Sequence, residues 1–250
     1  MHYKFLKKIV GILGYKIVEK NLIKNERLLS KYSFLKTKKV LEKIFSTNQI
    51  NFVIQIGSND GKRFDDLNEF IKKFKPKAIF VEPILSNFNE LKKNYSNQQY
   101  LIFENLAISV NNEINKLYKV KQSNLNLYDE HVLGITSFNK EHLIKHGIKK
   151  NHIDFEKVDS ISILELLKKH SVSNFDLLII DTEGYDANIV VDFLNNTRIR
   201  PTIIFEFIHS RNNDLKKALE LLQEKKYLVI KIEENIFCCP EENLNKLKII

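Results

Sequence analysis

The stretch Asn51 to Gly61, NFVIQIGSNDG, joins an apolar run to a turn with glycine at both ends, Gly57 and Gly61. A second apolar run, AIFV, ends in the acidic residue Glu82, 25 positions after Gly57. This order predicts a strand, a tight turn, a helix and a second strand with a carboxylate at its carboxyl end. Such an edge of a parallel sheet suits a nucleotide-type ligand, because glycine lets backbone amides approach and a carboxylate can accept both ribose hydroxyls.

The glycine spacing also indicates the kind of cofactor. The dinucleotide fingerprint G-x-G-x-x-G is absent, which disfavours an NAD-dependent oxidoreductase. One G-x-x-x-G turn with a distal acid fits S-adenosylmethionine better, because no pyrophosphate has to be held.

Apolar runs and helical stretches alternate along most of the chain, which predicts an α/β fold with an open, doubly wound sheet. The last two strands are separated by only three residues, so they form an antiparallel hairpin. We therefore expect a Rossmann-like, mostly parallel seven-stranded sheet with a terminal antiparallel hairpin. The expected strands are 52–56, 78–81, 100–108, 176–180, 202–207, 227–232 and 236–239. The expected helices are 64–74, 87–95, 162–170, 187–195 and 213–225.

The positive charge is confined to the start of the chain. Residues 1–50 account for the whole net charge of +9. Residues 51–250 hold 28 basic and 28 acidic side chains, so their charges cancel. Only five of the 40 basic residues are Arg, and base-specific readout favours Arg, so we expect no specific nucleic-acid partner. A neutral domain also lacks the basic stripe that an RNA methyltransferase needs.

Two domains are expected from this distribution: a basic helical N-terminal extension, 1–50, and a methyltransferase domain, 51–250. Residues 4–17 are amphipathic at helical period, and a second basic amphipathic segment covers about 28–45. These segments either dock on their own domain or lie on an anionic membrane surface. Residues 119–157 fit no regular pattern, and we interpret them as an insertion on the acceptor side of the site.

Cellular location is predicted from what the sequence lacks. No apolar run reaches the ~18 residues of a membrane span, and no cleavage site follows the first apolar stretch. The two cysteines, Cys238 and Cys239, are adjacent, which suits neither a structural disulfide nor a metal site. We expect a cytoplasmic protein, with peripheral contact to the inner face of the membrane through residues 4–17 as an open alternative.

A second acidic cluster, Asp181-Thr-Glu-Gly-Tyr-Asp186, follows the apolar run DLLII. At the carboxyl end of a buried strand these side chains face the ligand crevice. Asp and Glu there also cap helices, and we assign that role to Asp186. For Asp181 and Glu183 we favour a function in the site.

The segments VIQIGSNDG, IFVEP, NLAIS, ITSF, SISILELL, LLIIDTEGYD and IIFEF together resemble the FkbM family of S-adenosylmethionine-dependent methyltransferases. The resemblance covers about 51–209, and its most specific element is 180–186. It implies the class I methyltransferase fold and O-methylation, often of sugars or other hydroxyl-bearing metabolites. Gln55 stands where many members have Asp, so it can hydrogen-bond the methionine end of the cofactor but adds no charge.

The resemblance also implies roles for single residues. Glu82, followed by Pro83, takes the ribose hydroxyls, and Ala107 leaves room for the adenine. The implied cofactor-binding set is Gln55, Gly57, Ser58, Asn59, Gly61, Glu82, Pro83, Ala107 and Asp181.

O-methylation needs an acceptor oxygen that is aligned with the methyl group and relieved of its proton. The candidate catalytic residues are Asp181, Glu183, Glu206 and His209, and histidine is the natural base near neutral pH. Asp181, Glu206 and His209 could instead hold a divalent cation, an alternative that no helical H-x-x-x-H spacing supports, and we assign no metal ligands. The other histidines are assigned no role: His2, His131, His142, His146, His152 and His170.

The predicted function is an S-adenosylmethionine-dependent O-methyltransferase acting on a sugar, a glycan or another small metabolite. The alternative from a different class is a catalytically silent Rossmann-like scaffold or membrane-surface module. The sequence leaves the acceptor and the oligomeric state open.

Overall fold

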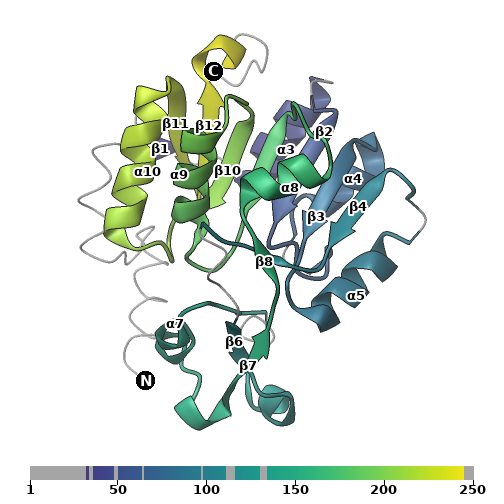
Figure 1. The fold of residues 1–250 in the computed structure, drawn as a ribbon, viewed down its shortest axis with the longest axis vertical. Helices are drawn as coiled ribbons and strands as arrows, with labels where there is room; N and C mark the ends of the chain where they lie inside the picture. The colour runs from purple at the N-terminus through teal and green to yellow at the C-terminus, as the bar shows by residue number, and fades with distance from the viewer. Residues whose placement is uncertain are drawn as a thin grey trace.

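A computed structural model describes residues 32–33, 36–47, 50–63, 65–96, 98–110, 116–129 and 134–244. Figure 1 shows a central sheet covered by helices on both faces, with a smaller group of elements, β6, β7 and α7, below one edge of it. The expected α/β class is confirmed.

The large sheet has the strand order β1-β11-β12-β10-β9-β2-β3-β4. Its strands are β1 (Tyr32–Ser33), β2 (Phe52–Ile56), β3 (Lys77–Val81), β4 (Leu101–Glu104), β9 (Leu177–Ile180), β10 (Thr202–Glu206), β11 (Tyr227–Ile232) and β12 (Asn235–Pro240). Every pairing is parallel except those of β12, which is antiparallel to both of its neighbours. The mostly parallel sheet with an antiparallel hairpin is thus confirmed. The predicted number of seven strands was wrong, because β1 adds an eighth at the edge.

Strand order reverses between β2 and β9, since the chain builds outward from β2 through β3 to β4 and from β9 to β10. Ligands of doubly wound sheets bind in the crevice at such a reversal, beyond the carboxyl ends of the strands. Gly57 follows β2 and Asp181 follows β9, and the Asp181 amide donates to the carbonyl of Ile56 at 2.9 Å. The two motifs that stand out in the sequence therefore meet at the reversal.

Helices cover the sheet because the strands are apolar on both faces. α8 (Ile163–Lys169), α9 (Asp186–Asn196) and α10 (Asn212–Glu224) pack on one face, and their buried residues share one cluster with β2, β9 and β10. α3 (Thr37–Ser46), α4 (Asn68–Phe74) and α5 (Leu85–Asn94) contribute to the cluster on the other face. A capping box between Ser162 and Glu165 begins α8.

The strand expected over 100–108 is interrupted, which corrects the prediction. It divides into β4 and β5 (Ala107–Ile108), and β5 pairs with β8 (Ser160–Ile161) in a separate two-stranded sheet. The Asn105 side-chain amide donates to the carbonyls of Glu82 and Pro83, at 3.0 Å each, and holds the bend. This bend turns Ala107 away from the large sheet.

The insertion, 119–157, contains regular structure that its sequence pattern did not predict. β6 (Lys116–Val120) and β7 (Ile153–Lys157) pair in antiparallel register, and α7 (Lys140–Lys145) lies between them in the chain. Two 3₁₀ helices, η2 (Gln122–Leu127) and η3 (Lys150–His152), complete it, and a third, η4 (Glu241–Asn243), follows β12. A small core of its own holds the insertion together: Val120, Ile135, Leu143, Ile148 and Ile153.

The N-terminal extension is only partly described, and the amphipathic segment 4–17 lies outside the described residues. α3 is helical as expected, and its apolar residues Val40, Leu41, Ile44 and Phe45 are buried in the core. β1 departs from the all-helical prediction. The described part of this extension therefore docks on the domain, and the boundary at residue 51 stays a prediction.

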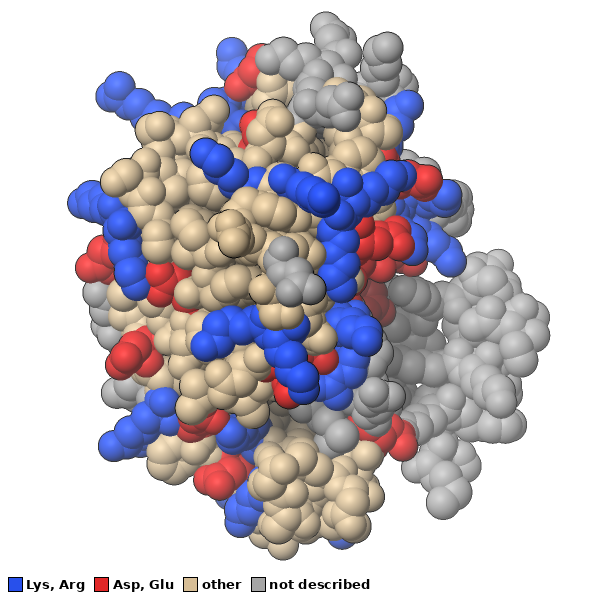
Figure 2. Space-filling view, turned by 90° about the vertical axis from the view of Figure 1, so that its right-hand side faces the viewer, with Lys and Arg blue, Asp and Glu red and all other residues tan. Residues whose placement is uncertain are grey.

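Charged side chains on the face shown in Figure 2 are mixed, with Asp and Glu between the Lys and Arg. Among the described residues, none of the helices combines the length and the apolar character needed to cross a bilayer.

Candidate active site

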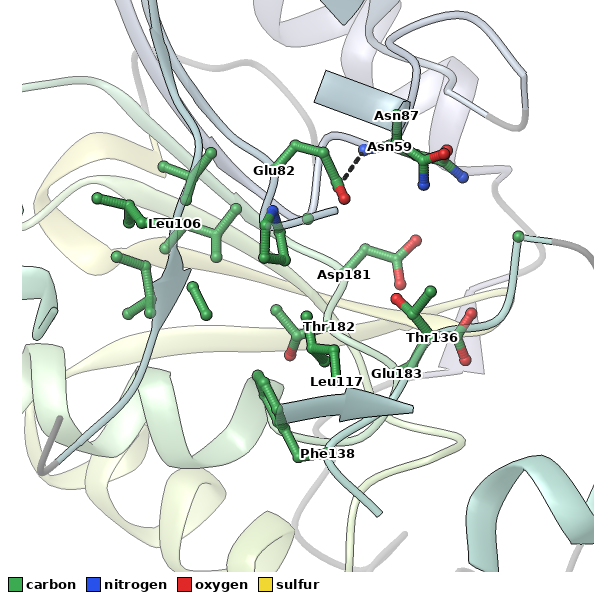
Figure 3. A pocket seen from close by; sticks show the side chains of 17 residues that line it. Asn59, Glu82, Asn87, Leu106, Leu117, Thr136, Phe138, Asp181, Thr182 and Glu183 are labelled. Atoms are coloured by element: carbon green, nitrogen blue, oxygen red, sulfur yellow. Dashed lines mark hydrogen bonds between the residues drawn. The ribbon is translucent and has the colours of Figure 1, made fainter. Parts of the chain in front are cut away.

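A cavity that is partly open to solvent lies at the carboxyl ends of β2, β3 and β9. Figure 3 shows side chains from the sheet edge, from β5 and from the insertion directed into it. The lining residues are Ile56, Gly57, Asn59, Val81, Glu82, Pro83, Asn87, Leu106, Ala107, Ile108, Leu117, Gly134, Thr136, Phe138, Asp181, Thr182 and Glu183.

The turn after β2 is fixed between two neighbouring strands. The backbone amides of Gly57 and Ser58 donate to the Val81 carbonyl at 2.9 and 3.0 Å. Gly57 has φ +82°, and a Cβ there would lie 1.7 Å from the Asp181 carbonyl oxygen. Only glycine therefore fits, because both the backbone conformation and the adjacent strand end exclude a side chain.

Glu82 is buried and its carboxylate is held by the backbone. It accepts hydrogen bonds from the amides of Asn59 and Ile84 at 2.8 and 2.9 Å. Burial raises the pKa of Glu82 to about 7, and the negative charges of Glu156 and Asp181 add to the effect. Because each oxygen accepts one amide, each keeps a lone pair for a ligand hydroxyl.

Three residues of the expected cofactor-binding set do not line the cavity. Gln55 is buried, and its amide donates to Asp65 Oδ1 at 3.3 Å. The Ser58 hydroxyl donates to the Gln55 carbonyl at 3.2 Å. A Cβ on Gly61 would lie 2.4 Å from a Leu91 methyl carbon, so Gly61 allows α5 to pack closely. These residues shape the turn from behind, whereas Gly57, Asn59, Glu82, Pro83, Ala107 and Asp181 face the cavity.

The loop after β9 carries the two acids that line the cavity. Asp181 lines the cavity and is exposed to solvent there. Desolvation by the surrounding protein raises the pKa of Asp181, and the charge of Glu183 raises it further. The pKa of Glu183 is raised by burial and by the charge of Glu234.

Asp186 has a different role from the helix cap that the sequence predicted. It is fully buried as the first residue of α9, and its carboxylate reaches back into the preceding loop. Oδ2 accepts from the Thr182 hydroxyl at 2.8 Å and from the Gly184 amide at 3.2 Å. Asp186 therefore holds the shape of the loop that presents Asp181 and Glu183.

Glu183 adopts the left-handed backbone conformation, with φ +55°, which is uncommon for a residue with a side chain. The Ser137 hydroxyl donates to its carbonyl at 3.1 Å and ties the loop to the insertion. Gly184 follows with φ +109°, and a Cβ there would lie 2.8 Å from the His209 carbonyl oxygen. This loop therefore packs closely against the segment that follows β10.

Glu206 and His209 do not line the cavity but lie behind Glu183. His209 Nε2 is 3.7 Å from Glu183 Oε2 and 3.8 Å from Glu206 Oε1. Burial raises the pKa of Glu206, and the charges of Asp181 and Glu183 raise it further. The four predicted catalytic residues form one connected group, of which Asp181 and Glu183 face the cavity.

Two further histidines belong to this group, although the sequence had suggested no role for them. His142 Nε2 lies 3.1 Å from Glu183 Oε2. The imidazole rings of His142, His146 and His209 have centroids 4.5 to 4.9 Å apart. His142 and His146 are four positions apart, an H-x-x-x-H spacing around α7 that was visible in the sequence.

The remaining walls are largely apolar. Leu106, Ala107 and Ile108 line one side, and Leu117 and Phe138 line another. The rings of Phe138 and Tyr185 meet edge to face at 5.2 Å. β6 and the segment after it thus complete the cavity.

The chain is similar to several solved structures at low sequence identity. A methyltransferase FkbM from Methylobacillus flagellatus KT has a TM-score of 0.45 and 11% identity, over 76% of this chain and 43% of that chain. An O-methyltransferase from Bacillus cereus in complex with SAH has a TM-score of 0.42 and 10% identity, over 93% of this chain and 95% of that chain. At this similarity neither supports an argument about the site. No curated protein shows significant sequence similarity to the chain.

The family model of the methyltransferase FkbM domain matches residues 55–229. The matched region begins on β2, before the glycine turn, and ends on β11. It contains Glu82, the acidic loop and the insertion, and it spans more than half of the chain. The chain belongs to the FkbM family of methyltransferases.

Proposed function

We propose that this protein is an S-adenosylmethionine-dependent O-methyltransferase that acts on a hydroxyl of a sugar, a glycan or another small metabolite. The observation that carries the proposal is the composition of the cavity. One half of the cavity, at the sheet edge, is lined by the Gly57 turn and the buried acid Glu82. The other half is lined by Asp181 and Glu183 and by residues of the insertion.

The residues present fit the cofactor. Glu82 has lone pairs left for two hydroxyls, as a ribose requires, and its own amide partners hold it in place. Ala107, between Leu106 and Ile108, offers a flat apolar surface for an aromatic base. Asn59 and Asp181 supply polar atoms where a methionine moiety would extend. When bound, the cofactor supplies an electrophilic methyl group.

The protein would orient the acceptor oxygen and receive its proton. Asp181 suits the second task, because its raised pKa makes it a better proton acceptor than an aspartate with the ordinary pKa. Glu183 orients the acceptor from the adjacent position, and Glu206 and His209 support Glu183 from behind. Leu117 and Phe138 would contact the acceptor's apolar surface and keep water out.

The proposed partners are small. Residues 51–250 carry no net charge, which favours a sugar or metabolite over a polyanionic acceptor. A cytoplasmic location with peripheral contact of residues 4–17 to an anionic membrane remains part of the proposal.

Calorimetry with S-adenosylmethionine and its demethylated product tests the first step. We expect both to bind with one site per chain, and an absence of binding by both would favour the scaffold alternative. Mass spectrometry after incubation with monosaccharides, nucleotide sugars and oligosaccharides then tests the second step. Methylation adds one CH₂, a mass gain of ~14 Da. A gain located on a hydroxyl supports O-methylation, whereas a methyl group found only on nitrogen would contradict it.

A further inference from the structure

We propose that His142, His146, His209 and Glu183 bind a first-row divalent metal ion of the zinc class beside the cavity. From the sequence we assigned no metal ligands and left a divalent cation as an open alternative. The metal site is independent of the proposed function.

The ligand set is assembled by three separate parts of the chain. His142 and His146 come from α7 and its C-terminal end, Glu183 from the loop after β9, and His209 from the segment after β10. The candidate ligand atoms of His142, His146 and His209 lie within 4.8 Å of one another. Those of Glu183, Glu206 and His209 form a second such group. His209 belongs to both groups, and the 3.1 Å contact between His142 Nε2 and Glu183 Oε2 links them a second time.

The distances are close to those of a bound ion. Two donor atoms at ~2.1 Å from one zinc ion lie no more than ~4.2 Å apart. Glu183 Oε2 is already 3.1 Å from His142 Nε2 and 3.7 Å from His209 Nε2. Small rotations of the side chains would close the rest of the cluster around an ion.

The surroundings favour a cation as well. His142, Glu183 and His209 have side chains that are 11%, 23% and 20% exposed, whereas His146 is exposed and leaves the cluster open to solvent on its side. Within the described part of the chain, Glu206 Oε2 is buried without a hydrogen-bond partner. A divalent cation would offset the electrostatic repulsion between the carboxylates of Glu183, Glu206 and the nearby Asp181.

The donor types indicate the class of metal. Imidazole nitrogens with one carboxylate suit Zn²⁺, Co²⁺ or Ni²⁺, whereas Mg²⁺ and Ca²⁺ prefer sets made of oxygen. Three histidines and one carboxylate fill the four positions of a tetrahedral zinc site. Glu183 also lines the cavity, so the proposed ion lies next to the cavity wall.

The loop geometry explains how Glu183 is brought to the histidines. Its left-handed backbone and the contact of Gly184 with the His209 carbonyl turn the Glu183 side chain toward α7. Residues in such strained conformations often occur at ligand sites.

The test is a titration of the chelator-treated full-length protein with Co²⁺, whose visible absorption reports its coordination. We expect one equivalent to give the bands of a four- or five-coordinate site, Zn²⁺ to displace it, and Mg²⁺ to have no effect. His142→Ala and His209→Ala should each weaken binding by at least ~100-fold. The matched control is His170→Ala, because His170 also pairs with a glutamate, Glu104, but outside the cluster.

A second measurement needs no variant. Zn²⁺ should protect His142, His146 and His209 from modification by diethyl pyrocarbonate, as measured by mass spectrometry. The extent of modification of His152 and His170 should be the same with and without Zn²⁺. Unchanged modification of the three histidines, or Co²⁺ binding that survives in both His142→Ala and His209→Ala, would overturn the proposal. The cluster would then be only a hydrogen-bonded network.

Calorimetry with S-adenosylmethionine on the metal-free and zinc-loaded protein separates this proposal from the proposed function. Cofactor binding without metal binding overturns only the metal site. Metal binding without cofactor binding overturns only the methyltransferase proposal.

Discussion

A methyl group placed on Gly57 would lie 1.7 Å from the carbonyl oxygen of Asp181. The turn after β2 and the end of β9 are thus in direct contact at the point where strand order reverses. The cofactor half of the cavity and its proposed catalytic half cannot shift independently, because both depend on this contact.

Gly57→Ala should therefore unfold or distort the site, since the clash is with backbone and φ is +82°. Gly147→Ala is a matched control: φ is +84°, but nothing lies within 4 Å of the added Cβ. The control should lose only the ~1–2 kcal/mol of a left-handed alanine. Thermal and urea unfolding measure both, and equal losses in the two variants would contradict the role assigned to Gly57.

Glu82→Ala should weaken cofactor binding by about 2–4 kcal/mol, because two charge-assisted hydrogen bonds are lost. The control is Glu104→Ala, which removes another buried acid at the end of the neighbouring strand, one that pairs with Lys169 and His170 outside the cavity. Calorimetry should show near-normal cofactor affinity for the folded control. An unchanged affinity in Glu82→Ala would remove this residue from the site.

Cofactor binding should release protons between about pH 6 and 7.5. Burial raises the pKa of Glu82 to about 7, so much of it is protonated in this range. Ribose hydroxyls donate to the ionised form and lower its pKa, so binding expels the proton and affinity rises with pH. Calorimetry in buffers of different ionisation enthalpy measures the release, which should vanish in Glu82→Gln. Affinity that falls as pH rises would contradict the assignment.

The elements that the sequence predicted well are those whose pattern is local. β2, β3 and β9 are short apolar runs buried on both faces. Gly57 directly follows β2, and Glu82 directly follows β3. The pairing of β1 with β11 involves two residues and leaves no periodic signal. The break at Asn105 depends on carbonyls of a neighbouring strand, so the strand looked continuous.

The acidic half of the site was predicted because DTEGYD directly follows a buried strand. The histidine cluster was not, although His142 and His146 are correctly spaced. α7 has only six residues, too few for a clear helical period. Its contact with Glu183 also depends on how the insertion folds back, which no local pattern encodes.

Asp186→Ala should destabilise the protein and disorder the loop that it holds. The change leaves the half-buried Thr182 hydroxyl and Gly184 amide without their acceptor, at up to about 1–3 kcal/mol for each group. Asp192→Ala on the same helix is the control, since its carboxylate bonds only Asn196 nearby. Urea unfolding measures the difference, and a loss no larger than that of the control would contradict the role of Asp186.

The same residue gives a signed pH dependence. Burial raises the pKa of Asp186 to about 7, above the ordinary value near 3.8. The folded state then binds more protons than the unfolded state between these values, so the free energy of unfolding falls as pH rises from about 4 to 7. Asp186→Asn should flatten this decline, and a steeper decline in the variant would contradict the assignment.

Asp181→Asn tests the proposed chemistry. If Asp181 takes the acceptor proton, kcat should fall by about 10²–10⁴, the range of general acid–base catalysis. Cofactor affinity should change little, because the amide keeps the shape of the side chain.

In the wild type the rate should rise with pH until Asp181 is ionised and then level off, since its pKa is raised. In the variant it should keep rising at high pH, as the acceptor ionises without help. A pH–rate profile of the two proteins decides the question. Near-wild-type rates in the variant at every pH would leave positioning alone as the source of catalysis.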